Sequence, residues 1–253
     1  QVTAGSDEDI CDTEVFDMTT FTVAPTESNN SGIQWSTSGT GTFGDDTQLI
    51  TTYTPSAADI TAGSVTLTLT AFGNANCGDI SDDMTLTITP SPVADAGDDL
   101  TICEGDALDL SASGTVVITN ESTVSWSTSG NGTFDDNTAN TPIYTPSAAD
   151  ITAGTVTLSL TVNGNGPCTV PANDDMILTI TPAPVVDAGS DESTCSNQAI
   201  DLSGATTPAS ASNTSGLTWT TSGDGAFDDA TALLPTYTPG AGDATAGTVT
   251  LTL

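Results

Sequence analysis

The sequence predicts an all-β protein built from tandem antiparallel β-sandwich domains that form an extended rod. One stretch occurs three times, at 53–70, 144–162 and 237–253. In the second copy a turn at 146–154 is followed by strict alternation, with apolar Val156, Leu158, Leu160 and Val162 separated by Thr and Ser. Period-two alternation is typical of a half-buried strand, and three copies in one chain indicate a repeat protein.

Equivalent residues recur about 92 positions apart, which fits a complete sandwich domain of roughly 100 residues. They are the first cysteines Cys11, Cys103 and Cys195, the tryptophans Trp35, Trp126 and Trp219, and the tyrosines Tyr53, Tyr144 and Tyr237. We therefore predict a first repeat at 1–91, a second at 92–183, and a third at 184–253 that lacks its closing strand.

Each repeat contains one of these tryptophans and one of these tyrosines, and we predict that all six lie in the cores. Each tryptophan follows an apolar residue two positions earlier on the same strand face, as Val124 precedes Trp126. The alternative is that the tryptophans are platforms for sugar rings, but one per repeat is typical of a sandwich core. The only helical feature expected is a single turn at 147–151.

The charge of the chain excludes several classes of function. It has 33 acidic residues and no Lys, Arg or His. Nothing can neutralise a phosphate, so we expect no nucleic-acid partner and no binding to anionic membrane surfaces. The lack of a long apolar run predicts no insertion into a membrane. Without His or Lys, most general bases and Schiff-base chemistry are also excluded. Paired carboxylates resemble glycosidase sites, but they recur in every repeat, which indicates a scaffold. We predict that the chain is not an enzyme.

The cysteines have matched spacings that suggest disulfides within repeats. Cys11 and Cys77 are 66 apart, and Cys103 and Cys168 are 65 apart. We predict the pairs Cys11–Cys77 and Cys103–Cys168, with Cys195 bonded to a cysteine beyond Leu253. Such long loops would stabilise an extracellular protein by about 4 kcal/mol each. The alternatives are free thiols in a cytosolic protein and, less compatible with the absence of His, a zinc site.

Acidic residues gather where the repeats meet. The clusters are Asp95, Asp98 and Asp99, and Asp187, Asp191 and Glu192. Calcium prefers carboxylate oxygens in loops, so these six residues are candidate calcium ligands, and calcium is the only cofactor the sequence suggests. No EF-hand pattern is present, and the alternative is that they are turn and capping aspartates on a solvated surface.

The segments between repeats favour a stiff chain. Pro-x-Pro occurs at 90–92 and 182–184, and such sequences favour the polyproline II conformation. No apolar run is long enough to span a bilayer. The chain starts within a motif and stops within a strand, so we expect it to be a piece of a longer exported protein.

The motifs are similar to those of a known family. Ala-Gly-x-Asp, Trp-x-Thr-Ser-Gly-x-Gly-x-Phe and Tyr-Thr-Pro followed by Gly-x-Val-x-Leu-x-Leu resemble PKD-like (polycystic-kidney-disease-type) immunoglobulin-like repeats. The cysteine-containing form resembles tandem repeats of giant Bacteroidetes surface adhesins that the type IX system secretes, gliding adhesins among them. Ser-Gly-x-Gly stands where PKD domains have Gly-Asp-Gly.

The resemblance implies stalk repeats of an extracellular, cell-surface adhesin filament that serves attachment and gliding motility. Its partners would be neighbouring repeats of the same chain, and the resemblance carries over no catalytic residue. The alternative function is a calcium-dependent module that binds glycans or ice.

Overall fold

The computed structural model describes residues 1–74, 76–196 and 198–253. Strands dominate, and the chain forms two compact units: residues 1–102 with 106–179, and residues 103–105 with 180–253. The first unit therefore holds the first predicted repeat and all of the second except residues 103–105 and 180–183. Among the described helices, none is both long and apolar enough to cross a membrane.

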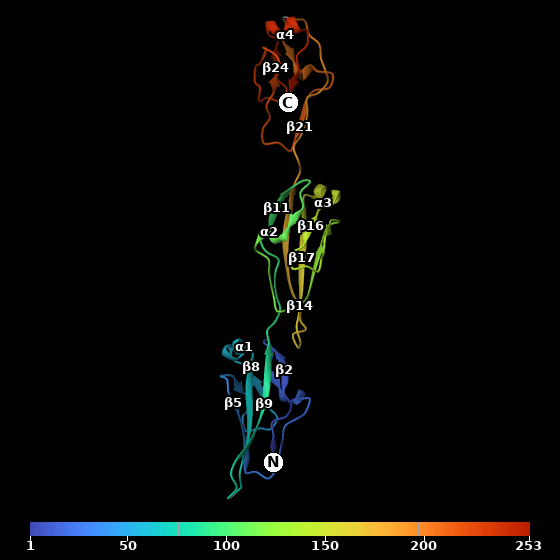
Figure 1. The fold of residues 1–253 in the computed structure, drawn as a ribbon. Coiled ribbons are helices and arrows are strands. Elements are labelled where there is room, and N and C mark those ends of the chain that lie inside the picture. The colour runs from blue at the N-terminus through green and yellow to red at the C-terminus, as the bar shows by residue number, and fades with distance from the viewer. Residues whose placement is uncertain (75, 197) are drawn as a thin grey trace. The chain divides into compact units, whose positions relative to one another are not determined.

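The first repeat has strands in two main sheets (Figure 1). Its elements are β1 (Val2–Thr3), β2 (Glu8–Cys11), β3 (Phe16–Asp17), η1 (Met18–Thr20), β4 (Thr26–Glu27), β5 (Gly32–Thr37), β6 (Thr42–Phe43), β7 (Thr52–Thr54), α1 (Ala57–Ala62), β8 (Ser64–Phe72) and β9 (Ile80–Thr89). One sheet has the order β2-β9-β8-β5, the other has the order β3-β7-β6, and β1 pairs with β4.

The second repeat has the same arrangement. Its elements are β10 (Val93–Asp95), β11 (Leu100–Cys103), β12 (Leu108–Asp109), α2 (Leu110–Ser113), β13 (Val117–Thr119), β14 (Glu121–Thr128), β15 (Thr133–Phe134), β16 (Ile143–Thr145), α3 (Ala148–Ala153), β17 (Thr155–Gly164) and β18 (Ala172–Thr181). The sheets are β11-β18-β17-β14, β12-β16-β15 and β10-β13.

The third repeat keeps the smaller sheets and only part of the large one. Its elements are β19 (Val185–Asp187), β20 (Ile200–Asp201), η2 (Leu202–Gly204), β21 (Ser210–Ser212), β22 (Thr220–Thr221), β23 (Ala226–Phe227), β24 (Thr236–Thr238), α4 (Ala241–Ala246) and β25 (Leu251–Thr252). The sheets are β20-β24-β23, β19-β21 and β22-β25.

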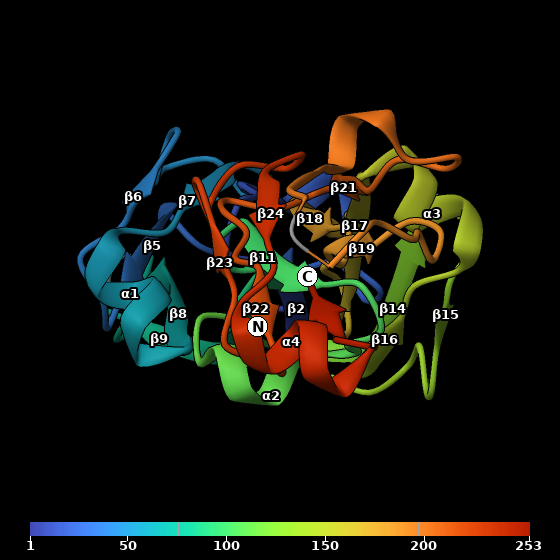
Figure 2. The same cartoon turned by 90° about the horizontal axis from the view of Figure 1, so that it is seen from above.

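The recurring stretch forms a short helix and then the long strand of each repeat. Figure 2 shows α1 beside β8 and α3 beside β17. The expected single turn is the six-residue helix α3, which Ser147 caps and which ends at Gly154 in the left-handed conformation. On β17 every second residue, from Val156 to Val162, is buried, so the alternation places one face in the core as predicted.

The tryptophans and tyrosines lie in the cores. Trp35, Trp126 and Trp219 are at most 3% exposed, and Tyr53, Tyr144 and Tyr237 at most 1%. In each repeat a phenylalanine packs between them, as Phe134 does between Trp126 and Tyr144. Because these rings face the core, they do not form a platform for sugars on the surface.

In the first repeat, the pairing of β2 with β9 differs from the antiparallel pattern that the sequence predicts. β2 runs parallel to β9, with Glu8 opposite Leu86 and Cys11 opposite Thr89. The C-terminal ends of β2 and of the closing strand β9 therefore lie side by side. This pairing determines where the cysteines lie.

Candidate functional site

The first cysteine of the chain lies where the first repeat meets the following linker. Cys11 ends β2 opposite Thr89, the last residue of β9. The next residue, Asp12, donates its backbone N–H to the carbonyl of Thr89 at 2.9 Å. Its carboxylate accepts a hydrogen bond from the hydroxyl of Ser91. The end of β2 is therefore fixed to the start of the linker.

A disulfide connects this point to the second repeat. Cys168 lies in the loop between β17 and β18, and it bonds to Cys11 across 157 positions of sequence. Both half-cystines are buried, at 5% and 2% exposure, and the Cα atoms are 4.8 Å apart. Asn120 of the second repeat donates its side-chain amide to the carbonyl of Ser91 at 2.8 Å. The linker is thus held from both sides. We call this set of contacts the cysteine junction.

The cysteine junction corrects the predicted disulfides Cys11–Cys77 and Cys103–Cys168. In the structure Cys11 bonds to Cys168, and Cys77 and Cys103 are free and exposed. Cys11, in β2, lies opposite the last residue of the ten-residue strand β9, whereas Cys77 comes before the first residue of β9. Ten residues of strand span about 30 Å, far beyond the 7 Å that a disulfide can bridge between Cα atoms. Equal spacing reflected the repeat, not proximity.

Half of the same junction recurs at the second linker. Glu104, which follows Cys103, donates its backbone N–H to the carbonyl of Thr181 at 2.8 Å, as Asp12 does to Thr89. Its carboxylate accepts the N–H of Ala183 at 2.9 Å. Asn213 donates its side-chain amide to the carbonyl of Ala183 at 3.1 Å, as Asn120 does to that of Ser91. Both asparagines are left-handed, with φ of 60° and 56°.

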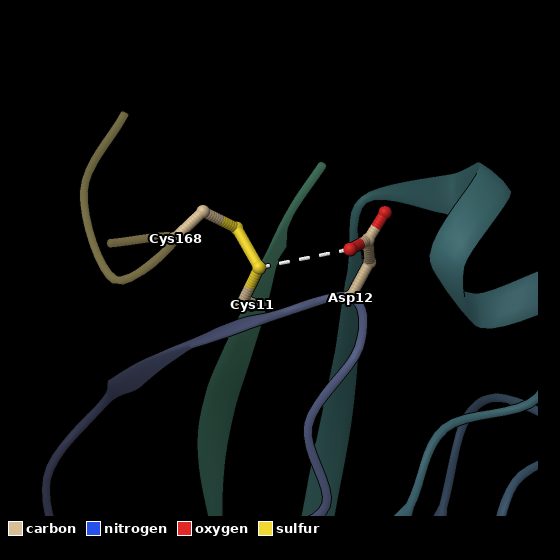
Figure 3. A group of neighbouring side chains, drawn as sticks. All are labelled: Cys11, Asp12 and Cys168. Atoms are coloured by element: carbon tan, nitrogen blue, oxygen red, sulfur yellow. Dashed lines mark hydrogen bonds between the residues drawn. A yellow bond between two sulfur atoms is a disulfide. The ribbon is translucent and has the colours of Figure 1, made fainter. Parts of the chain in front are cut away.

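Figure 3 shows the carboxylate of Asp12 beside the disulfide, with Oδ1 3.6 Å from Sγ of Cys11. Cys11, Asp12 and Cys168 are the one group of three potential metal ligands within the described residues. The sulfurs are shared in a disulfide, so neither is a thiolate that could bind a metal ion. We therefore assign the group to the cross-link and not to a metal.

The six predicted calcium ligands act as hydrogen-bond acceptors in turns or are left solvated. Asp95 and Asp187 accept the backbone N–H groups of Gly97 and Gly189, at 2.9 and 2.8 Å. Asp99 accepts the N–H of Ile177 at 2.8 Å.

Glu192 accepts the N–H of Thr206 at 2.6 Å and the hydroxyl of Ser190 at 2.9 Å. These two bonds hold the pKa of Glu192 below its usual range. The carboxylates of Asp98 and Asp191 accept no hydrogen bond from the residues that the structure describes. In the described part of the chain, no three of the six come close enough to share an ion.

A buried aspartate, which the sequence analysis overlooked, organises each repeat. Asp59 is 2% exposed and occupies the first turn of α1. Its carboxylate accepts backbone N–H groups from Thr40, Gly41 and Ser56, at 2.8–2.9 Å, and the hydroxyl of Tyr53 at 2.8 Å. One side chain therefore joins the Ser-Gly-x-Gly bend, the core tyrosine and the helix start. Asp150 and Asp243 occupy the same place in the other repeats.

The glycine before Thr40 is needed for this arrangement. A Cβ atom on Gly39 would lie 2.1 Å from Oδ1 of Asp59, and one on Gly130 equally close to Asp150. Side-chain atoms cannot approach so closely, and only glycine leaves room for the carboxylate. The Ser-Gly-x-Gly motif and the distant aspartate are thus two parts of one structure.

The third repeat shows how the network tolerates a change. Gly240 replaces the capping serine, so the helix α4 has no side-chain cap at that residue. The carboxylate of Asp224 takes over, accepting the N–H groups of Gly242 at 2.9 Å and Asp243 at 3.1 Å. The network therefore keeps its hydrogen bonds with different residues.

The buried aspartates are ionised despite their burial. Burial by itself raises the pKa of Asp59, but the hydrogen bonds from Ser56, Thr40 and Tyr53 outweigh it and lower the pKa from 3.8 to about 2. Hydrogen bonds from the equivalent residues also lower the pKa of Asp150. Burial and the neighbouring carboxylate raise the pKa of Tyr53. The four donors take the place of a cation, which the chain does not have.

Comparison with known proteins identifies no family for the chain. No family model and no curated protein matches the chain. Solved structures of tandem β-sandwich domains are similar to the chain at low identity. Mouse cadherin-23 EC22–24 has a TM-score of 0.48 at 15% identity, over 93% of this chain and 85% of that one. Titin I67–I69 has a TM-score of 0.43 at 11% identity, over 94% of this chain and 86% of that one. Protocadherin gamma B7 extracellular cadherin domains 1–4 have a TM-score of 0.42 at 12% identity, over 94% of this chain and 68% of that one.

Proposed function

We propose that the chain is a structural, non-enzymatic segment of a cell-surface adhesin filament, which serves attachment and, as in the gliding adhesins it resembles, motility. The observation that carries this proposal is the Cys11–Cys168 disulfide, which joins two consecutive repeats across their linker. A cross-link in that position restrains the linker and limits extension, both useful in a stalk. It adds nothing to a self-contained binding domain.

The use of the acidic residues supports the same role. Carboxylates cap helices, hold the bends of each repeat and fix the linkers, as Asp59 and Glu104 do. The remaining negative charge, part of a net −33, keeps neighbouring stalks apart and soluble. A disulfide persists in oxidising surroundings, which favours an extracellular location. The partners of each repeat are then its neighbours in the chain.

Antibodies raised against the chain test the location and the role together. We expect them to label intact, unpermeabilised cells of the source organism. A protease of broad specificity, added to the intact cells, should remove the label. Label that appears only after permeabilisation would contradict the proposal.

Adding the purified chain to an attachment assay separates a stalk from the alternative calcium-dependent module for glycans or ice. A stalk segment leaves attachment unchanged at any calcium concentration. If the free chain competes with the cells for the surface, the chain is itself the binding module, and the stalk assignment is wrong.

A further inference from the structure

We infer that these repeats cross-link by a nearest-neighbour rule: the first cysteine of one repeat bonds to the hairpin cysteine of the next. Cys11 and Cys168 are the pair that the chain completes. By this rule Cys103 is the site for the hairpin cysteine of a completed third repeat, and Cys77 is the site for the first cysteine of a preceding repeat. The inference concerns covalent assembly and does not depend on the adhesive role.

The surroundings of Cys103 support the rule, because they match those of Cys11. Both cysteines end a strand next to the closing strand of their repeat. The residue after each donates its N–H to the last residue of the closing strand, at 2.9 Å for Asp12 and 2.8 Å for Glu104. The half of the junction that a first cysteine needs is therefore already formed at the second linker.

Cys77 and Cys168 share two features of their described surroundings. Cys77 donates its N–H to the carbonyl of Asn74 at 3.0 Å, and Cys168 donates to Asn165 at 3.1 Å. A glycine precedes each cysteine by four residues, and a larger residue does not fit there. A Cβ atom on Gly73 or Gly164 would lie within 2.5 Å of the carbonyl oxygen of the cysteine. The bonded and the free hairpin cysteine thus share this backbone hydrogen bond and the close approach of a glycine.

The two cysteines of a repeat lie at opposite linkers, which excludes the pairing within a repeat. In the second repeat Cys168 lies against the linker before it, with Sγ 3.2 Å from the carbonyl of Thr89. Cys103 lies against the linker after it, through Glu104 and Thr181. Cys195 starts the same turn as Cys11, since the carbonyl of each accepts the N–H of the residue three positions later. Like Cys103, Cys195 is exposed and free.

Forming each cross-link requires an oxidant, which we take to be a low-molecular-weight or protein disulfide. The thiolate of one cysteine attacks the oxidant, forms a mixed disulfide and releases one thiol. The thiolate of the neighbouring repeat then attacks the mixed disulfide and releases the second thiol. Two protein thiols lose two electrons, the oxidant gains them, and the two protons leave with the released thiols.

A count of free thiols in the unreduced, denatured chain tests the rule without any added sequence. The wild type should have three, because one disulfide uses two of its five cysteines. Cys11→Ser should have four, since Cys168 loses its neighbour and does not turn to Cys103. Cys77→Ser, the matched control, should have two. Two free thiols in Cys11→Ser would mean that two of the remaining four cysteines, for example Cys103 and Cys168, form a bond that the rule does not allow, and would overturn it.

Completing the third repeat tests the proposed site directly. The full chain is extended beyond Leu253 by a copy of residues 161–181, which in the second repeat contain the hairpin cysteine and the closing strand. We expect a disulfide between Cys103 and the appended cysteine, and none when serine replaces the appended cysteine. A bond to Cys195, or a free Cys103, would overturn the inference. If the added hairpin does not fold, the thiol count still decides.

Discussion

Pulled from its two ends without reductant, the chain should release far less length than the same chain in reductant. The difference should equal the 157 positions between Cys11 and Cys168. At about 3.5 Å per residue, this is roughly 550 Å of contour length. Force enters at the first strands, crosses the disulfide and leaves through β18, so the residues between the cysteines never bear tension along the backbone. Single-molecule force spectroscopy measures this length directly.

Cysteine variants identify the disulfide that prevents this contour length from being released. Cys168→Ser should release the full length without reductant, whereas Cys77→Ser should behave as the wild type does. Bonds within repeats would instead hide two separate segments of 66 and 65 positions. Two such segments, in place of one long one, would contradict the cross-link between repeats.

Replacing Asp59 by alanine should lower the free energy of unfolding of the first repeat by about 3 kcal/mol or more. The substitution leaves three backbone N–H groups and the hydroxyl of Tyr53 without their acceptor in a buried site. Each buried donor without a partner costs about 1–3 kcal/mol. Hydrogen exchange, read separately for peptides from β8 and β17, measures the loss in the first repeat and uses the second as an internal standard.

The matched control for this substitution is Asp83→Asn, which removes a carboxylate from an exposed position on β9. It should change the exchange of β8 by less than about 0.5 kcal/mol, as surface substitutions usually do. Equal effects of the two variants would mean that the buried network does not hold the repeat together.

The same network sets the response to acid. Because the folded pKa of Asp59 is about 2 and its unfolded value is 3.8, its contribution to stability is complete above about pH 4 and is lost as the pH falls toward 2. The shift corresponds to about 2 kcal/mol. The chain's own repulsion also decreases over this range, because its 33 acidic side chains take up protons. Wild type and Asp59→Ala should therefore converge in stability between pH 4 and 2.

The alternation and the repeat were sufficient to predict the fold, because burial on a strand follows directly from a period of two. Val156 to Val162 and Trp126 are buried as that pattern requires. Pairing of the cysteines could not be predicted from their spacing, since 66 positions of sequence do not say which end of a strand each residue reaches. The parallel pairing of β2 with β9, a long-range contact, decides it.

The buried aspartates could have been predicted from the sequence. Ser147 and Asp150 have the spacing of a capping box, and the aspartate recurs in all three copies of the turn. Aspartate in a turn is usually solvated, and this general tendency concealed the motif. What the sequence does not indicate is that the carboxylate also reaches Asn131 and Tyr144, which come from other strands and loops.

Mapping the disulfides of the unreduced chain by mass spectrometry tests the cross-link between repeats most directly. Trypsin cannot cut a chain without Lys or Arg, so a protease that cleaves at acidic residues is used. The structure predicts one linked pair of peptides, which carries Cys11 and Cys168, with Cys77, Cys103 and Cys195 alkylated as free thiols. Linked peptides that carry Cys11 with Cys77, and Cys103 with Cys168, would contradict it.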